Sequence, residues 1–138
     1  MEQTTINLVQ ESFEKVKPIA STAADIFYTK LFELDPALKP LFPTDKAGAM
    51  VEQGNKLMTM LGAAVAGLSN MDALIPVLKG LGKRHVDYKV EPSHYETVGA
   101  ALLGTLEAGL GDEFTSEVKE AWTTVYGTMS GVMIEAAY

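Results

Sequence analysis

The 138-residue chain contains no cysteine. This absence excludes disulfide frameworks, cysteine-ligated zinc, cysteine-ligated iron–sulfur clusters and thiol catalysis. It is typical of a protein that works in a reducing compartment. The N-terminus, MEQTTINLVQESF, also lacks the basic and apolar segments of a secretory signal peptide. We therefore expect a cytoplasmic protein.

Positive charge and long apolar runs are both scarce. Eleven Lys and Arg stand against 18 Asp and Glu, a net charge of −7. Such a balance repels a phosphate backbone or an anionic membrane unless the basic residues gather on one face, and the sequence indicates no such gathering. The longest uncharged apolar run, MTMLGAAVAGL, has about half of the roughly 20 residues that a membrane-spanning helix needs. We predict neither nucleic-acid binding nor membrane insertion.

No stretch of useful length alternates apolar and polar residues as a half-buried strand does. Instead, apolar residues recur at the three-to-four spacing of a helix with one buried face. The spacing predicts an all-α fold in a single domain, residues 1–138. Ser93 followed by Glu96 predicts a capping box at the start of the fifth helix. The predicted helices cover about 4–17, 19–34, 46–68, 76–88, 94–110 and 116–136.

Prolines interrupt the helical pattern between the second and third predicted helices. Pro36, Pro40 and Pro43 bracket the segment DPALKPLFP, where fixed φ angles and missing amides prevent a long regular helix. We therefore expect Leu41 and Phe42 to project from a short turn.

Both histidines of the chain lie in GLGKRHVDYKVEPSHY, residues 80–95. His85 falls on the apolar face of its predicted helix, where a histidine is more often a packed core residue than a ligand. Gly80 and Gly82 precede it, and each costs roughly 1 kcal/mol relative to Ala within a helix. These glycines indicate either that another group approaches the backbone closely or that the packing there is flexible. The residues alone leave both interpretations open.

Several kinds of site are disfavoured by the pattern around these residues. A zinc site needs three or four ligands, and only two histidines and scattered carboxylates are present. No serine lies on the strand–turn–helix of a hydrolase, and GLGK follows a helix and not a strand, unlike a phosphate-binding loop. A haem held by one imidazole requires only a dry slot and a few polar groups, for which Tyr28 and Gln53 are candidates. A plain apolar core remains the alternative.

Four segments carry a resemblance to a known family: FYTKLFELDPALKPLF at 27–42, EQGNKLM at 52–58, the KRH…HYETVGAALL run at 83–103, and AWTTVYG at 121–127. Over essentially its whole length the chain resembles single-domain bacterial haemoglobins and the globin module of flavohaemoglobins. The resemblance implies a globin fold, with helices around one buried haem b.

The resemblance also implies roles for individual residues. His85 becomes the proximal iron ligand, Phe42 packs against the haem plane, and Tyr28 with Gln53 forms the distal pair that faces bound gas. Ala24 and Gly54 permit two helices to cross closely, and His94 becomes a structural residue at a helix start. The remaining residues implied to line the pocket are Leu57, Val90, Tyr95, Val98, Leu102, Tyr126 and Met133.

The function implied by the resemblance is reversible binding of O2, with high affinity, for storage or delivery. NO and CO are further expected ligands. The alternatives are an NO dioxygenase that depends on a separate reductase, and a gas or redox sensor that acts through a partner. Both a monomer and a homodimer are compatible with the sequence. One departure bears on this choice: the family's carboxylate near Tyr95 is replaced by Ala137, and the nearest carboxylate is Glu135.

Overall fold

The computed structural model describes residues 2–42, 48–87 and 90–138. Every regular element in these ranges is helical, which confirms the all-α prediction. Short 3-10 helices occupy Lys17–Ile19, Pro36–Leu41 and Gly111–Glu113. The α-helices are α1 (Gln3–Val16), α2 (Ala20–Leu34), α3 (Ala49–Gly67), α4 (Met71–Asp87), α5 (Pro92–Leu110) and α6 (Ser116–Ala137).

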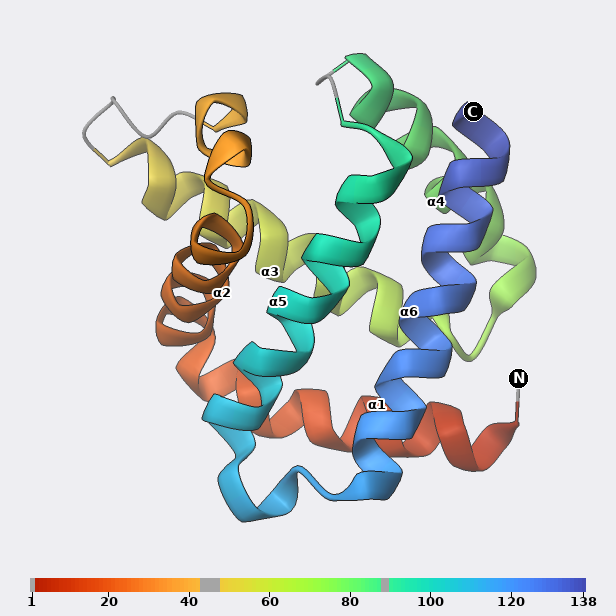
Figure 1. Cartoon of the computed structure of the whole chain (residues 1–138). Coiled ribbons are helices and arrows are strands. Elements are labelled where there is room, and N and C mark those ends of the chain that lie inside the picture. Colours follow the sequence, from red (N-terminus) through yellow and green to blue (C-terminus); the bar gives the residue numbers. More distant parts are fainter. Residues whose placement is uncertain (1, 43–47, 88–89) are drawn as a thin grey trace.

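Helix α6 connects two parts of the fold (Figure 1). Its first half packs on α1, which crosses the lower half of the molecule in this view, and its C-terminal half lies beside α4. Helix α2 packs against both α5 and α3. Among the described residues, no helix has the length and apolar character required to cross a membrane.

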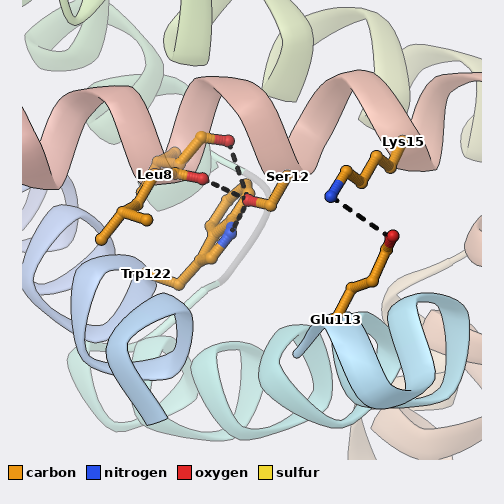
Figure 2. Close-up of polar contacts among 6 residues, drawn as sticks. Leu8, Ser12, Lys15, Glu113 and Trp122 are labelled. Carbon is orange, nitrogen blue, oxygen red and sulfur yellow. Dashed lines mark hydrogen bonds and ion pairs between the residues drawn. The ribbon is translucent and has the colours of Figure 1, made fainter. Parts of the chain in front are cut away.

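A buried polar contact fixes α1 on α6 (Figure 2). Trp122 is fully buried, and its indole Nε1 donates a hydrogen bond to Ser12 Oγ at 2.8 Å. The same hydroxyl donates to the main-chain oxygen of Leu8 at 2.7 Å, so both polar groups are satisfied inside the core. The neighbouring Lys15–Glu113 ion pair, at 3.4 Å, is exposed and contributes at most about 1 kcal/mol.

The helix that carries His85 begins earlier than the sequence predicts. Helix α4 starts at Met71, so Pro76 lies inside it and not at its first turn. An internal proline removes one helical hydrogen bond and costs about 3 kcal/mol. Leu74 and Leu78, on either side of the proline, are both buried, and their packing holds the helix together across it. The predicted end at Tyr88 falls outside the described residues.

The cap of α5 also differs from the prediction. The N-cap is Glu91, followed by Pro92 at the first helical position, where a missing amide costs little. The main-chain amide of Glu91 donates to His94 Nδ1 at 3.0 Å, and these two residues form the capping box in place of Ser93 and Glu96. The structural role expected for His94 is thus confirmed.

Candidate functional site

His85 lies near the end of α4 and is half-buried. Its Nδ1 is 3.1 Å from the hydroxyl of Tyr95, which α5 contributes. Burial, followed by the positive charge of Arg84, lowers the pKa of His85 below its ordinary value. The imidazole is therefore neutral at pH 7, which is the form that binds metal ions.

Tyr95 is buried and is itself held in place from α6. The hydroxyl of Tyr126 donates to the main-chain oxygen of Tyr95 at 2.6 Å. Burial, with a smaller contribution from Tyr138, raises the pKa of Tyr95 to about 12, so its phenol stays protonated at neutral pH. A fixed, neutral phenol therefore lies at hydrogen-bonding distance from the His85 ring and constrains its orientation.

Helix α4 meets α6 one turn before His85. A Cβ added to Gly82 would lie 2.5 Å from the main-chain oxygen of Met133, whereas a Cβ added to Gly80 would meet no atom of the described residues within 4 Å. The hypothesis that a close approach requires glycine is therefore correct for Gly82 and wrong for Gly80. After the helix, the amide of Val90 donates to the main-chain oxygen of His85 at 2.9 Å, which fixes the chain direction beyond the imidazole.

The carboxylate that the resemblance associates with Tyr95 has no substitute in the described ranges. Glu135 is exposed and lines an outer cleft with Lys79 and Lys83, and the Tyr95 hydroxyl has no carboxylate partner among the residues described. The nearby group is instead the phenol of Tyr138, whose hydroxyl donates to the main-chain oxygen of Val90. Tyr138 was not among the predicted site residues, because nothing in its spacing distinguishes it.

A second group of predicted residues lies around Tyr28 on α2. The Tyr28 side chain is 7% exposed, and its hydroxyl is 3.5 Å from the main-chain oxygen of Gln53. Burial raises the pKa of Tyr28 despite an opposing contribution from Gln53, so the phenol is a neutral hydrogen-bond donor. The ring of Phe42, which follows the 3-10 helix Pro36–Leu41, meets that of Tyr28 edge-on at 5.4 Å.

Phe32 completes this aromatic group and was not among the residues predicted from the sequence. Its ring centroid lies 6.0 Å from that of Tyr28 and 5.5 Å from that of Phe42. A signal was available, because Phe32 follows Tyr28 by four residues on one helix and so lies on the same face.

The crossing of α2 and α3 places Tyr28 and Gln53 next to each other. A Cβ added to Gly54 would lie 3.0 Å from the Cβ of Ala24, which is one turn before Tyr28. The prediction of a close crossing at these two small residues is confirmed. The other predicted lining residues belong to the same core: Leu102 and Met133 are buried, and Leu57, Val90, Val98 and Tyr126 are half-buried and pack against it.

The residues present fit a haem. The donor set consists of one neutral imidazole with Tyr95 at its Nδ1, while the Tyr28 hydroxyl and the main-chain oxygen of Gln53 are polar atoms beside an otherwise apolar lining. Iron in a haem needs one such nitrogen donor from the protein, and apolar walls exclude water from the porphyrin. The fold and the site together define an all-α protein of the haem-binding type.

Comparison with known proteins agrees with this class. Residues 25–133 match the Globin family, and the chain belongs to that family. A flavohemoprotein of Xylella fastidiosa (strain Temecula1 / ATCC 700964) is 32% identical over 132 residues, which cover 94% of this chain and 32% of the relative. Neuroglobin of Danio rerio is 29% identical over 136 residues, which cover 91% of this chain and 86% of that protein.

A further relative extends the likeness across almost the whole chain. The flavohemoprotein of Vibrio cholerae serotype O1 is 29% identical over 135 residues, covering 96% of this chain and 34% of the relative. The chain spans about a third of the length of the flavohemoproteins that it matches. Its membership of the globin family makes it a haem globin.

Proposed function

We propose that this chain binds one haem b through His85 and reversibly binds O2 with high affinity, as a store or carrier. The observation that carries the proposal is the buried, neutral phenol of Tyr28 beside Gln53. The haem supplies a ferrous iron to which diatomic gases bind reversibly. We also propose that residues 1–138 form one globin domain.

The chain's own residues would hold the cofactor by packing and by one ligand. His85 would provide the iron ligand, with its ring kept neutral by burial and oriented by Tyr95. Phe42 and Leu57 would pack against the ring system, together with Val90, Val98, Leu102, Tyr126 and Met133. Because the chain has no cysteine, thioether attachment of a c-type haem is excluded, which favours haem b.

The distal pair would set the preference among gases. A phenol or amide donor stabilises a polar ligand that carries partial negative charge, as bound O2 does, more than it stabilises apolar CO. Tyr28 retains its proton at neutral pH, so its hydroxyl can donate to such a ligand. High affinity with slow release of O2 follows from this arrangement, and NO and CO are additional ligands.

The two histidines provide a matched test of the cofactor site. His85→Gly should abolish the visible spectrum of a histidine-ligated haem, and added imidazole should restore it. His94→Ala should retain the spectrum, because His94 caps a helix. Acid extraction of the wild-type protein should release haem b. A histidine-ligated spectrum in His85→Gly without imidazole would refute the ligand assignment.

Stopped-flow measurement of O2 dissociation tests the distal pair. One hydrogen bond to a ligand is worth about 1.5–3 kcal/mol when charge is involved, so Tyr28→Phe should speed dissociation about 10- to 100-fold. Gln53→Leu should also speed it. Tyr138→Phe removes a different hydroxyl, one bonded to the Val90 main chain, and should change the rate far less. Dissociation rates that are the same in Tyr28→Phe and wild type would show that this hydroxyl does not contact the gas.

The second candidate function is NO dioxygenation, in which NO and O2 give nitrate and a separate reductase supplies electrons. The observation that favours it is the similarity to flavohemoproteins over nearly the whole chain. The observation that opposes it is the Tyr95 hydroxyl, which lacks a carboxylate partner among the described residues. Electrochemical measurement of NO consumption with a flavodoxin reductase distinguishes the two: many turnovers support the enzyme, and a single stoichiometric reaction supports the carrier.

A further inference from the structure

The ring of Tyr28 is surrounded by three phenylalanine rings. Its centroid lies 5.1 Å from that of Phe27, 5.4 Å from that of Phe42 and 6.0 Å from that of Phe32. The first two contacts are edge-on, with interplanar angles of 82° and 67°, and the third is tilted by 32°. Aromatic pairs prefer such offset or edge-to-face arrangements at centroid separations of about 4.5–7 Å. Packing against aromatic rings therefore restricts the position of the phenol.

Phe32 differs from Phe27 because its ring also contacts that of Phe42, at 5.5 Å with an interplanar angle of 62°. Phe32, Tyr28 and Phe42 therefore form a closed triangle in which each ring touches the other two. Tyr28 and Phe32 are one turn apart on α2, whereas Phe42 follows the 3-10 helix Pro36–Leu41. Phe32 thus supports Tyr28 directly, and supports it a second time through Phe42.

On its other side along α2, Tyr28 is next to the close crossing with α3. One turn before Tyr28, a Cβ added to Gly54 would lie 3.0 Å from the Cβ of Ala24. One turn after Tyr28, the contact is the ring of Phe32. Because the crossing already holds the main chain of α2, Phe32 acts on the direction of the Tyr28 side chain.

The hydroxyl of Tyr28 is held less tightly than its ring. Its contact with the main-chain oxygen of Gln53 is 3.5 Å long, whereas hydrogen bonds between oxygens are ordinarily about 2.5–3.0 Å. Burial raises the pKa of Tyr28, so the hydroxyl keeps its proton at neutral pH. A ring fixed by packing, with a weakly engaged hydroxyl, is a preorganised donor, because little must be broken before the proton turns to a new acceptor. The ring contacts therefore hold this donor in place more firmly than the contact with Gln53 does.

We propose that Phe32 is a positioning residue for the distal donor: by packing on Tyr28 and Phe42, it keeps the Tyr28 hydroxyl aimed at bound gas and so sets the preference for O2 over CO. The inference rests on the proposed haem at His85 and on the proposed donation by Tyr28. Phe32 is half-buried and packs against the core. It acts through Tyr28, and the residues implied to line the haem pocket do not include it. An aromatic pair of this kind is equivalent to about 2- to 10-fold in an equilibrium constant.

Dissociation of O2 and of CO from the ferrous holoprotein, measured by stopped flow, tests the proposal. Phe32→Leu removes the ring and should speed O2 dissociation about 3- to 10-fold, with CO dissociation changed by less than about twofold, because the polar ligand depends on the donor. Phe114→Leu is the matched control, since Phe114 is also half-buried against the core but follows the distant 3-10 helix Gly111–Glu113. It should leave both rates at the wild-type value.

A conservative variant shows whether the ring itself matters. Phe32→Tyr retains an aromatic ring at this position and should release O2 more slowly than Phe32→Leu. Three results would overturn the proposal: an unchanged O2 rate in Phe32→Leu, an equal change for the two gases, or the same O2 rate in Phe32→Leu and Phe32→Tyr.

A double-mutant cycle separates positioning from general loosening of the pocket. In the Tyr28→Phe background no hydroxyl remains to be positioned. Adding Phe32→Leu should therefore leave O2 dissociation within about twofold of the rate in Tyr28→Phe alone, although the same change has a larger effect in the wild-type background. Effects that multiply in the double variant would mean that Phe32 acts independently of the Tyr28 hydroxyl, and the proposal would be wrong.

The motion of the Tyr28 ring provides a readout that does not depend on gas kinetics. In the CO-bound holoprotein with ring-labelled tyrosine, NMR should show faster flipping of the Tyr28 ring in Phe32→Leu than in wild type or in Phe114→Leu, because a closely packed ring turns slowly. Tyr126, whose hydroxyl is bonded to the main chain of Tyr95, is the internal reference and should keep its wild-type flip rate. A Tyr28 flip rate that is the same with and without the Phe32 ring would contradict the proposal.

Failure of this proposal can be separated from failure of the proposed function. If Tyr28→Phe speeds O2 dissociation and Phe32→Leu does not, the positioning role of Phe32 alone is wrong. If Tyr28→Phe leaves O2 dissociation unchanged, the proposed distal donor is wrong, and the role of Phe32 is refuted with it.

Discussion

Replacement of Gly82 by alanine probes the contact that positions the His85 helix. The added methyl group would lie 2.5 Å from the main-chain oxygen of Met133, 2.9 Å from its Cα and 3.0 Å from its carbonyl carbon. These are main-chain atoms in the interior of α6, so they cannot move aside as the end of a flexible side chain can. Ordinary contact begins at 3.4 Å, so α4 must move outward by roughly 1 Å.

Gly80→Ala is the matched control for this change. Both glycines lie inside α4, and each alanine gains roughly 1 kcal/mol in helix propensity. Among the residues that the structure describes, only the methyl group at position 82 meets atoms of another helix. The difference in the free energy of unfolding between the two variants therefore isolates the overpacking cost, which we expect to be about 1–3 kcal/mol.

Two assays follow from the geometry. Urea unfolding of the apoproteins, monitored by circular dichroism, gives the difference in the free energy of unfolding. Transfer of haem to an excess of an apoglobin acceptor gives the rate of haem loss, which should rise in Gly82→Ala because His85 follows by three residues and moves with the helix. If Gly82→Ala is as stable as Gly80→Ala and loses haem at the wild-type rate, the contact with Met133 does not position the ligand.

Three further predictions follow from the buried polar groups. Ser12→Ala leaves the Trp122 indole without its partner and should lower the free energy of unfolding by about 1–3 kcal/mol in urea titrations; an unchanged value would mean that the indole finds another acceptor. Tyr95→Phe removes the hydroxyl at His85 Nδ1 and should shift the iron–histidine stretch in resonance Raman spectra of the ferrous protein; an unshifted band would contradict the contact. The pKa of His85 is lowered in the folded state, so the unfolded chain binds the extra proton first and apoprotein stability should fall as the pH drops below 6.5. Calorimetric melts of His85→Gln should show a weaker dependence in that range, and the same dependence as wild type would exclude His85 as its source.

Most of the fold could be predicted from the spacing of apolar residues, because the buried positions of a helix recur every three to four residues. The last predicted helix, at about 116–136, matches α6 within one residue of its end. Helix α4 was predicted too short because a proline is usually a sign of a first turn. Pro76 lies inside α4 since Leu74 and Leu78 are both buried, and this burial depends on neighbours distant in sequence.

The site was predictable where local spacing constrains it and not where distant segments meet. The proline-bracketed turn predicts a projecting Phe42, and the structure places that ring against Tyr28. The capping residues of α5 were misassigned, because a histidine acting as an acceptor, as His94 does, resembles no common cap pattern. The proximity of Tyr138 to Tyr95 depends on how α6 lies against α5, and no spacing within either helix encodes it.

Two contacts of α6 fix the positions of α4 and α5 on the side of the molecule that carries His85. Tyr126 is bonded to α5 at Tyr95, and Met133 is wedged against α4 at Gly82. These two positions are seven residues apart, which is close to two whole turns and about 10 Å of rise, so they share one side of the helix. Insertion of a single residue between them would turn one contact by about 100° relative to the other. The number of residues between Tyr126 and Met133 therefore sets the distance between the His85 and Tyr95 side chains, although neither residue belongs to α6.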